Sequence, residues 1–347
     1  MKTFKLLFGL TLIFCLTSFQ TFADEFTKEI EKEFKVDSDA LLKVKNKYGT
    51  IICKNWDQNK VSIKVEIKVE ASSEKKAQKM FENIDINISG SKNLIEAITE
   101  YDGGSIFKSS HIQINYYINM PKTLNVDIYQ KYGSLYIEDV SGVAKLGIKY
   151  GSLQAATLSN SKNEIYSAYS NASVDDFNSG IIDIQYSELS IDECKKILFS
   201  SKYSAVEIDE AEVIDMTSAY DDITIDQVIS ITSSSKFSNF SIDDLVSSLD
   251  FKLNYGNLEV DNVSPDFKKI TIENNYAGAE FGISSDASYN LDADVKYGSI
   301  DYPESKSNIN IKKHSHTQKS YIGTVGKDTN PTSTVIVRSK NCNTNLY

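Results

Sequence analysis

Residues 185–245 carry the pattern that decides the fold, in the four phrases QYSELSIDEC (185–194), KYSAVEIDEA (202–211), AYDDITIDQV (219–228) and KFSNFSIDDL (236–245). Each phrase has an aromatic residue, then a small or polar residue, and then alternating apolar positions. Six similar phrases extend the series from Tyr132 to Tyr297, at intervals of 17 to 21 residues. Repetition at such a period is typical of stacked structural units. We therefore expect a β-solenoid, in which each repeat forms one rung.

The apolar positions of the phrases predict which side chains face inward. With the aromatic counted as zero, positions +3 and +5 are apolar in nearly every phrase, and position +8 is apolar again after two polar residues. Alternation at period two is typical of a strand with one buried face. Each rung should hold about two short strands and two corners, and stacking should pair each strand in parallel with its copies. Position +3 comprises Leu135, Leu153, Ala172, Leu189, Val206, Ile223, Phe240, Leu258, Ala279 and Ile300.

The expected fold is all-β, a parallel β-solenoid (β-helix) of short rungs with about 17–21 residues each. The N-terminal third departs from the period. Its first rung lies at residues 44–56, and the next phrase begins only at Tyr132. Between them we predict a capping region with strands and one short helix, about 73–81, because an open end of stacked strands invites association. The predicted divisions are a signal peptide (1–23), a first rung and capping excursion (24–130), solenoid repeats (131–302), and last rungs with a C-terminal cap (303–347).

The N-terminus has the three parts of a secretory signal. Lys2 and Lys5 precede an apolar run at 6–16, and small residues at Thr21 and Ala23 predict cleavage after Ala23. We therefore expect an exported protein in the periplasm, on the outer-membrane surface or outside the cell. Cleavage would leave 347 − 23 = 324 residues and change the net charge from −11 to −13, because two lysines and no acidic residues are lost.

Charge and cysteine content limit the classes of partner that the chain can bind. A strongly acidic chain whose single arginine is Arg338 lacks the contacts that nucleic acid requires. No later segment has the length of a membrane span. Cys53 and Cys194 stand at positions that are apolar in other phrases, so we expect them to be buried. Cys342, near the C-terminus, is the cysteine that could pair between molecules.

The phrases VKNKYGTIICKNWDQNKVSIKV (44–65), INYYINMPKTLNVDIYQKYGSLYIEDVSG (114–142) and YIGTVGKDTNPTSTVIVRSK (321–340) resemble the "putative adhesin" family of exported bacterial proteins, a domain of unknown function common in Bacteroidetes. The resemblance spans nearly the whole mature chain. It implies a β-solenoid and an adhesive role at the cell envelope, and it brings no catalytic motif.

Position +6 is acidic in most phrases, which predicts a column of carboxylates on stacked rungs. Like charges on adjacent strands repel, so bound calcium or magnesium is one explanation, since both prefer oxygen ligands. The alternative is a solvated corner that discourages aggregation. The residues assigned to the cation hypothesis are Asp192, Asp209, Asp226 and Asp243.

The repeated aromatics are the second candidate surface, because sugar rings stack on aromatic faces. Each aromatic has the same parity as the apolar positions two and four residues before it. An internal aromatic stack is therefore predicted.

The favoured function is a non-enzymatic, exported, adhesin-like interaction surface at the bacterial cell envelope. The expected partners are glycans or envelope proteins, with self-association as a further alternative, and no cofactor is assigned. Two other functions remain open: a calcium-assisted enzyme acting on polysaccharide, and a structural or envelope-sensing periplasmic protein. No Gly-x-Ser-x-Gly motif supports a hydrolase, and a uniform acidic column distinguishes no acid–base pair.

Overall fold

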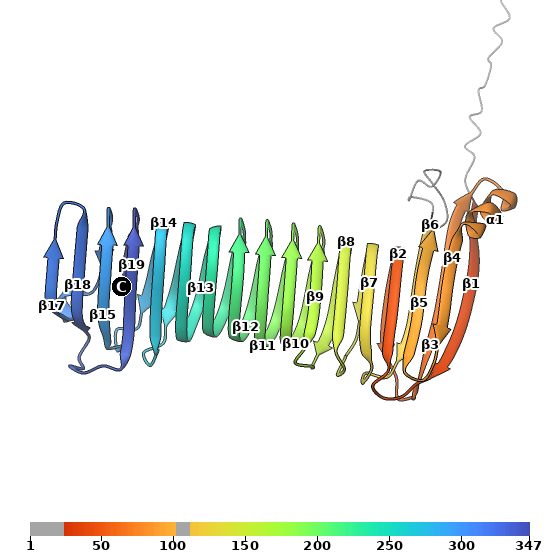
Figure 1. Cartoon of the computed structure of the whole chain (residues 1–347), viewed down its shortest axis with the longest axis horizontal. Coiled ribbons are helices and arrows are strands. Elements are labelled where there is room, and N and C mark those ends of the chain that lie inside the picture. Colours follow the sequence, from red (N-terminus) through yellow and green to blue (C-terminus); the bar gives the residue numbers. More distant parts are fainter. Residues whose placement is uncertain (1–23, 102–111) are drawn as a thin grey trace, which may run out of the picture.

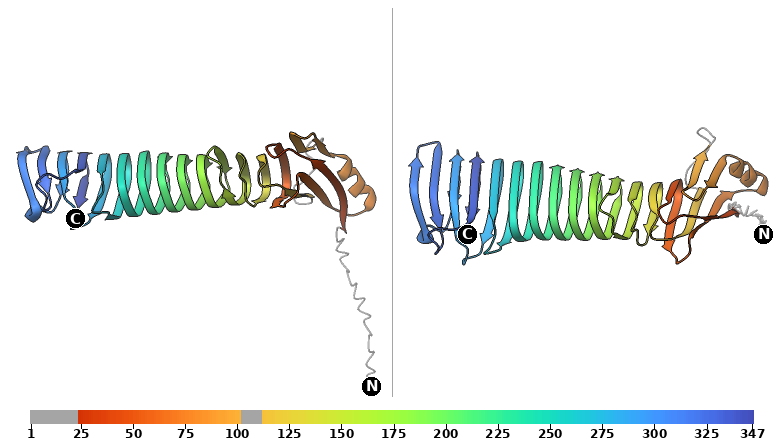
Figure 2. Two further views of the ribbon diagram at one scale, coloured as in Figure 1. Left: turned by 90° about the horizontal axis from the view of Figure 1, so that it is seen from below. Right: turned by 60° about the horizontal axis from the view of Figure 1, so that its bottom comes forward.

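The computed structural model describes residues 24–101 and 112–347, and only the backbone of residues 311–314. The predicted signal peptide lies outside the described residues. The chain is nearly all-β, and its strands form one large mixed sheet. Figure 1 shows the strands side by side along the long axis of the molecule, and Figure 2 shows the ribbon winding from each strand to the next.

The middle of the molecule is parallel throughout. Glu188 pairs with Asn171 on one side and with Ala205 on the other, and Ala205 pairs with Asp222. Each of these steps advances the chain by 17 residues, so every position of a phrase meets its own copy. The strands here are β7 (Asn125–Ile137), β8 (Ala144–Leu158), β9 (Asn163–Ala168), β10 (Asn171–Gln185), β11 (Glu188–Lys202), β12 (Ala205–Ala219), β13 (Asp222–Val263) and β14 (Lys269–Ile283).

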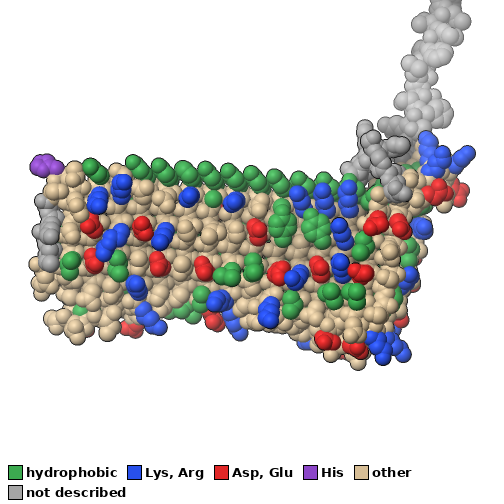
Figure 3. All heavy atoms as spheres, viewed as in Figure 1, with side chains coloured by type: hydrophobic (Ala, Val, Ile, Leu, Met, Phe, Trp, Pro, Cys, Tyr) green, Lys and Arg blue, Asp and Glu red, His purple; other side chains and the backbone are tan. Residues whose placement is uncertain are grey.

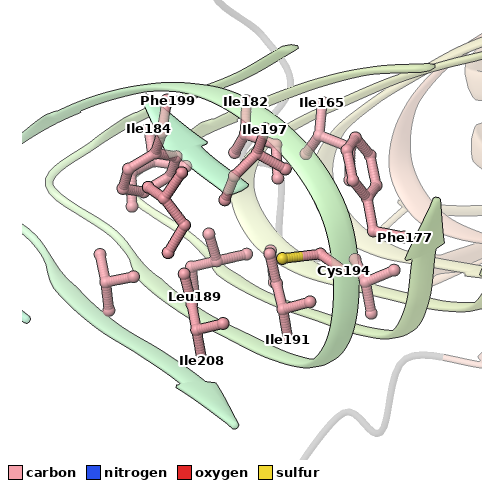
Figure 4. Packing of buried hydrophobic residues seen from close by; sticks show 14 of the residues in the cluster. Ile165, Phe177, Ile182, Ile184, Leu189, Ile191, Cys194, Ile197, Phe199 and Ile208 are labelled. Carbon is pink, nitrogen blue, oxygen red and sulfur yellow. The ribbon is translucent and has the colours of Figure 1, made fainter. Parts of the chain in front are cut away.

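The core follows the predicted positions. All ten residues at position +3 are buried, as are the apolar residues at +8. Figure 4 shows Ile191, Cys194 and Ile197 of β11 directed into the same interior. Cys53 and Cys194 are buried as predicted, and burial raises the pKa of each thiol to about 12. Full burial of one isoleucine side chain contributes roughly 1.5–3 kcal/mol, so the regular column of apolar side chains is the main stabilising element.

The N-terminal region covers one edge of this stack. β2 pairs in parallel with β7 on one side, and with β5 and β6 on the other. The pairings β1–β3, β3–β6 and β4–β5 are antiparallel. Ser73 caps helix α1, its hydroxyl accepting a hydrogen bond from the Lys76 N–H, which confirms the predicted short helix. The elements are β1 (Asp24–Lys35), β2 (Leu41–Asn55), β3 (Lys60–Ala71), α1 (Glu74–Glu82), β4 (Ile84–Gly90), β5 (Leu94–Tyr101) and β6 (Ile112–Met120).

The C-terminal strands do not follow the order of the sequence. β19 lies between β14 and β15 and pairs in parallel with both, and β20 lies between β14 and β16. β18 pairs antiparallel with β15 and with β17. The sheet is therefore parallel in the middle and antiparallel toward both ends. These elements are β15 (Tyr289–Lys296), β16 (Ser299–Asp301), the short 3-10 helix η2 (Glu304–Lys306), β17 (Ser307–His314), β18 (Gln318–Val325), β19 (Ser333–Lys340) and β20 (Asn343–Leu346).

Within the described ranges, no helix combines the length and the apolar composition that crossing a bilayer requires.

Candidate functional site: an exposed aromatic ridge

The repeated aromatics form one continuous stack on the surface, here called the aromatic ridge. Neighbouring ring centres are 4.8–5.2 Å apart, and the planes of neighbouring rings differ by 3–19°. Figure 3 shows a row of hydrophobic side chains along the upper edge of the molecule. The ridge consists of Tyr48, Tyr132, Tyr150, Tyr169, Tyr186, Tyr203, Tyr220, Phe237, Tyr255 and Tyr276.

The prediction that these aromatics point inward is wrong. From Tyr132 to Tyr276 each ridge residue is 40–52% exposed. All ten have φ between 51° and 64°, in the left-handed region. A left-handed residue turns the chain sharply, whereas the parity argument assumes an extended strand on both sides. The aromatic therefore stands at a corner and points outward, although its neighbours on either side alternate as predicted.

The left-handed conformation has an energetic cost. It costs roughly 1–2 kcal/mol for a residue other than glycine, and stacking of an aromatic pair returns roughly 0.5–1.5 kcal/mol. With one stacking contact per repeat, the two contributions are of similar size. Stability alone therefore does not account for an aromatic residue at this corner in ten repeats.

Buried polar groups hold the corners of the central repeats from inside, at Ser170, Ser187, Ser204, Asp221 and Ser238. Ser187 Oγ accepts a hydrogen bond from the Ser170 N–H at 3.2 Å, and Ser204 Oγ accepts one from the Ser187 N–H at 3.2 Å. Each of these hydroxyls also donates to the carbonyl two residues earlier, as Ser204 does to Lys202 O at 2.9 Å. Asp221 takes the same place on the next repeat and accepts the Ser204 N–H at 2.8 Å. These bonds link successive repeats directly beneath this part of the aromatic ridge.

Lysines precede several ridge residues and lie against their rings. Lys47 Nζ is 4.7 Å from the Tyr48 ring centre, and Lys131 Nζ is 4.9 Å from that of Tyr132. Lys149 Nζ is 5.3 Å from the Tyr150 ring centre. Such contacts contribute roughly 0.5–1 kcal/mol at exposed sites. They give one flank of the ridge a positive charge, on a chain that is negative overall.

The predicted acidic column exists as a feature of the surface. Each aspartate of the column directly follows a buried isoleucine, and these isoleucines pair in register, as Ile191 does with Ile208. The column comprises Asp192, Asp209, Asp226 and Asp243. Burial and repulsion by Asp226 and Asp192 raise the pKa of the Asp209 carboxyl. Burial and repulsion by Asp226 and Asp261 likewise raise the pKa of the Asp243 carboxyl.

A shallow groove of about 310 Å³ lies beside the column and includes Asp176, Glu193 and Glu210. In the part of the chain that the structure describes, no three or more His, Cys, Asp or Glu side chains are grouped to hold a metal ion. The cation role of the column stays a prediction.

Sequence reasoning missed one left-handed corner in line with the ridge. Asn341 has φ of 55° and stands where the aromatic of a phrase would be, between β19 and β20. Cys342 Sγ contacts Lys340 O at 3.2 Å, two residues earlier, as the corner serines do. The signal was present in SKNCNTNL (339–346), in which Thr344 and Leu346 occupy the buried +3 and +5 positions.

Comparison with known proteins gives weak likenesses. No family model matches the chain, and no curated protein matches it. A solved "putative cell adhesion protein" from Clostridium sporogenes is 12% identical over 92% of this chain and 99% of its own, with a TM-score of 0.21. A "putative adhesin" from Parabacteroides distasonis is 12% identical over 74% of this chain and 96% of its own, with a TM-score of 0.34.

A "putative lipid binding protein" from Parabacteroides distasonis is 9% identical over 72% of this chain and 95% of its own, with a TM-score of 0.35. Two of these three names agree with the adhesin resemblance of the sequence. At such TM-scores the likeness carries no argument about function.

Proposed function

We propose that the parallel strands are the coils of a β-solenoid, and that the protein is an exported, non-enzymatic, adhesin-like module of the bacterial cell envelope. The aromatic ridge is its contact surface. One observation carries this proposal: ten stacked rings run in register along the molecule, and nine of them are 40–52% exposed. The support for export is the signal-like sequence of residues 1–23.

The stacking decides what the ridge can contact. Because each ring covers the faces of its neighbours, a partner meets ring edges and hydroxyl groups rather than ring faces. Nine of the ten residues are tyrosines, so nearly every ring has a phenol hydroxyl, and the ring centres repeat at 4.8–5.2 Å. Rigid tyrosines offer large contact area at low cost in side-chain entropy. An extended polymer with many hydroxyl groups suits such a surface, and we assign a surface polysaccharide as the partner.

A binding role also follows from the uniformity of the surface. General acid–base catalysis needs two groups whose environments differ, so that one holds a proton and the other does not. Along the ridge and the acidic column each coil repeats the chemistry of the last. Uniform repetition suits many weak contacts along one chain, which together give high avidity.

A glycan array tests this function. We expect the protein to bind the long polysaccharides of the array in the presence and absence of calcium. It should release no shortened saccharides from them on prolonged incubation. Equal binding to short and to long saccharides would contradict binding along the ridge. Accumulation of cleaved products would contradict the non-enzymatic role.

We also propose that the acidic column acts as a solvated face without a resident cation. Its carboxylates are exposed or half-buried, and among the described residues no three or more His, Cys, Asp or Glu side chains are grouped to hold a metal ion, whereas calcium takes six to eight oxygen ligands. After treatment with EDTA, millimolar calcium or magnesium should leave the melting temperature unchanged. A rise of several degrees with either ion would instead support the cation hypothesis.

A further inference from the structure

The aromatic ridge has one missing ring. Lys340 of β19 pairs with Asn275 on one side and with Lys296 on the other. The residues that follow these three, Tyr276, Asn341 and Tyr297, therefore occupy the ridge position on three consecutive coils. All three have left-handed φ, of 53°, 55° and 54°. Asn341 thus keeps the corner but supplies no ring.

The result is a space between two aromatic faces, here called the slot. The stack of rings ends at Tyr276, and among the described residues no ring contact joins Tyr276 to Tyr297. Two strand spacings of about 4.8 Å place these two residues roughly 10 Å apart. Elsewhere on the ridge that distance holds one further ring. Tyr276 and Tyr297 are 52% and 64% exposed, the largest values among the repeated aromatics, as expected for rings that each lack one neighbour.

The charge around the slot differs from that of the molecule. Lys296 and Lys340 directly precede Tyr297 and Asn341, and neither has an ion-pair partner among the described residues. They line a groove of about 460 Å³ that also contains Lys252, Arg338 and two acidic residues. The acidic residues are partly engaged, since Asp294 accepts hydrogen bonds from Gln318 at 2.8 Å. Two free lysines beside an open stacking position favour a ligand with a negative charge.

We propose that the slot binds one acidic sugar ring, a hexuronate unit of a glycan. Tyr276 and Tyr297 contact its two faces, and Lys296 and Lys340 bind its carboxylate. The inference rests on the proposed function in that the partner is a glycan, and it adds the site and the sugar class. A neutral sugar or an aromatic side chain would fill the space between the rings but would leave both lysines unpaired.

The variant Asn341→Tyr tests the slot without disturbing the fold. Asn341 has the φ that eleven aromatics of this chain adopt, so a tyrosine there should complete the ridge and close the slot. Completion should raise the melting temperature through two new stacking contacts. Trigalacturonate is the probe, maltotriose is its neutral match, and N-acetyltyrosinamide tests an aromatic occupant. Binding is measured by calorimetry on the wild type, on Asn341→Tyr, and on Lys296→Gln/Lys340→Gln.

We expect trigalacturonate to bind the wild type, to bind Asn341→Tyr undetectably, and to bind the double lysine variant about tenfold more weakly, a change of about 1.4 kcal/mol. Equal binding of maltotriose, preferential binding of N-acetyltyrosinamide, persistent binding to Asn341→Tyr, or no binding to the wild type would each overturn the inference. Asn341→Tyr retains the ridge, so it should still retain long polysaccharides. Failure of the slot is thereby distinguished from failure of the proposed function.

Discussion

At the scale of single residues, the decisive feature is a tyrosine in the left-handed region of backbone space. Such a residue both turns the chain and projects its ring outward, and the next coil repeats the geometry about 4.8 Å away. The conformation is costly for any residue with a Cβ atom, and asparagine tolerates it better than most. Asn341 of this chain already occupies one such corner.

Replacement of Tyr203 should separate backbone strain from ring stacking. Tyr203→Asn and Tyr203→Ala both lose the stacking contacts with Tyr186 and Tyr220. Because asparagine accepts a φ of 54° more readily, we expect the asparagine variant to be more stable than the alanine variant by roughly 0.5–1 kcal/mol. Denaturant unfolding measures the difference. Equal stability, or a more stable alanine variant, would contradict the left-handed corner.

At the scale of elements, each strand is held by close backbone contacts and by buried polar groups at its corners. Most corner positions beneath the ridge carry serine or glycine, but Asp221 is a buried carboxylate that is only 2% exposed. Burial raises the pKa of its carboxyl, and hydrogen bonds from Ser218, Ser204 and Ala219 oppose that rise. Like the corner serines, Asp221 accepts a hydrogen bond from the backbone N–H of the preceding repeat, but its carboxylate places a charge in a buried site.

Replacement of Asp221 by serine should stabilise the protein at neutral pH. The folded-state pKa lies above the unfolded value, so the folded protein binds the proton more tightly and stability rises as the pH falls through the folded pKa. The cost is therefore fully present above the folded-state pKa and is lost as the pH falls below it. We expect Asp221→Ser to gain roughly 1 kcal/mol at pH 7, with the gain shrinking on acidification.

Unfolding of wild type and variant between pH 7 and pH 4 checks this. The neighbouring exposed Asp222 supplies the control Asp222→Ser, which should change the stability at pH 7 by less than about 0.5 kcal/mol. A gain from Asp221→Ser that stays constant with pH would show that the carboxyl is not the cause.

Two glycines of β8 differ in what a methyl group would meet. A Cβ atom on Gly151 would lie 1.8 Å from Gly133 O, a backbone atom of the adjacent strand. On Gly147 it would lie 2.5 Å from Tyr129 Cδ2, which belongs to a side chain that can rotate. Gly151→Ala should cost about 2–3 kcal/mol and Gly147→Ala less than about 1 kcal/mol. The midpoints of denaturant unfolding measure both losses of stability. Similar losses in the two variants would contradict the close approach of β7 and β8.

At the scale of the whole molecule, a short repeat predicts most of the interior. The period and the alternation identified the inward positions and the buried cysteines, because local pattern and stacking lead to the same arrangement. The orientation of the aromatics could not be read from parity, since a single left-handed residue reverses the side on which the next residues lie. The ridge was therefore identified by sequence but assigned to the wrong face.

The C-terminal arrangement had no clear local signal. Residues 333–346 lie between β14 and β15, although both of these strands come much earlier in the sequence. Strand order of this kind depends on long-range pairing, and a phrase with asparagine in place of the aromatic does not reveal its neighbours. The slot could not be predicted for the same reason, since it requires Tyr276, Asn341 and Tyr297 on three consecutive coils.

Binding of two triple variants to an immobilised surface polysaccharide tests the role of the aromatic ridge most directly. Tyr186→Asn/Tyr203→Asn/Tyr220→Asn removes the centre of the aromatic ridge at corners that tolerate asparagine. Asp209→Asn/Asp226→Asn/Asp243→Asn changes three repeats in the same region but leaves the ridge intact. We expect the ridge variant to bind at least about tenfold more weakly than the wild type, and the acidic-column variant to bind like the wild type. Full binding by the ridge variant would show that the ridge is not the contact surface.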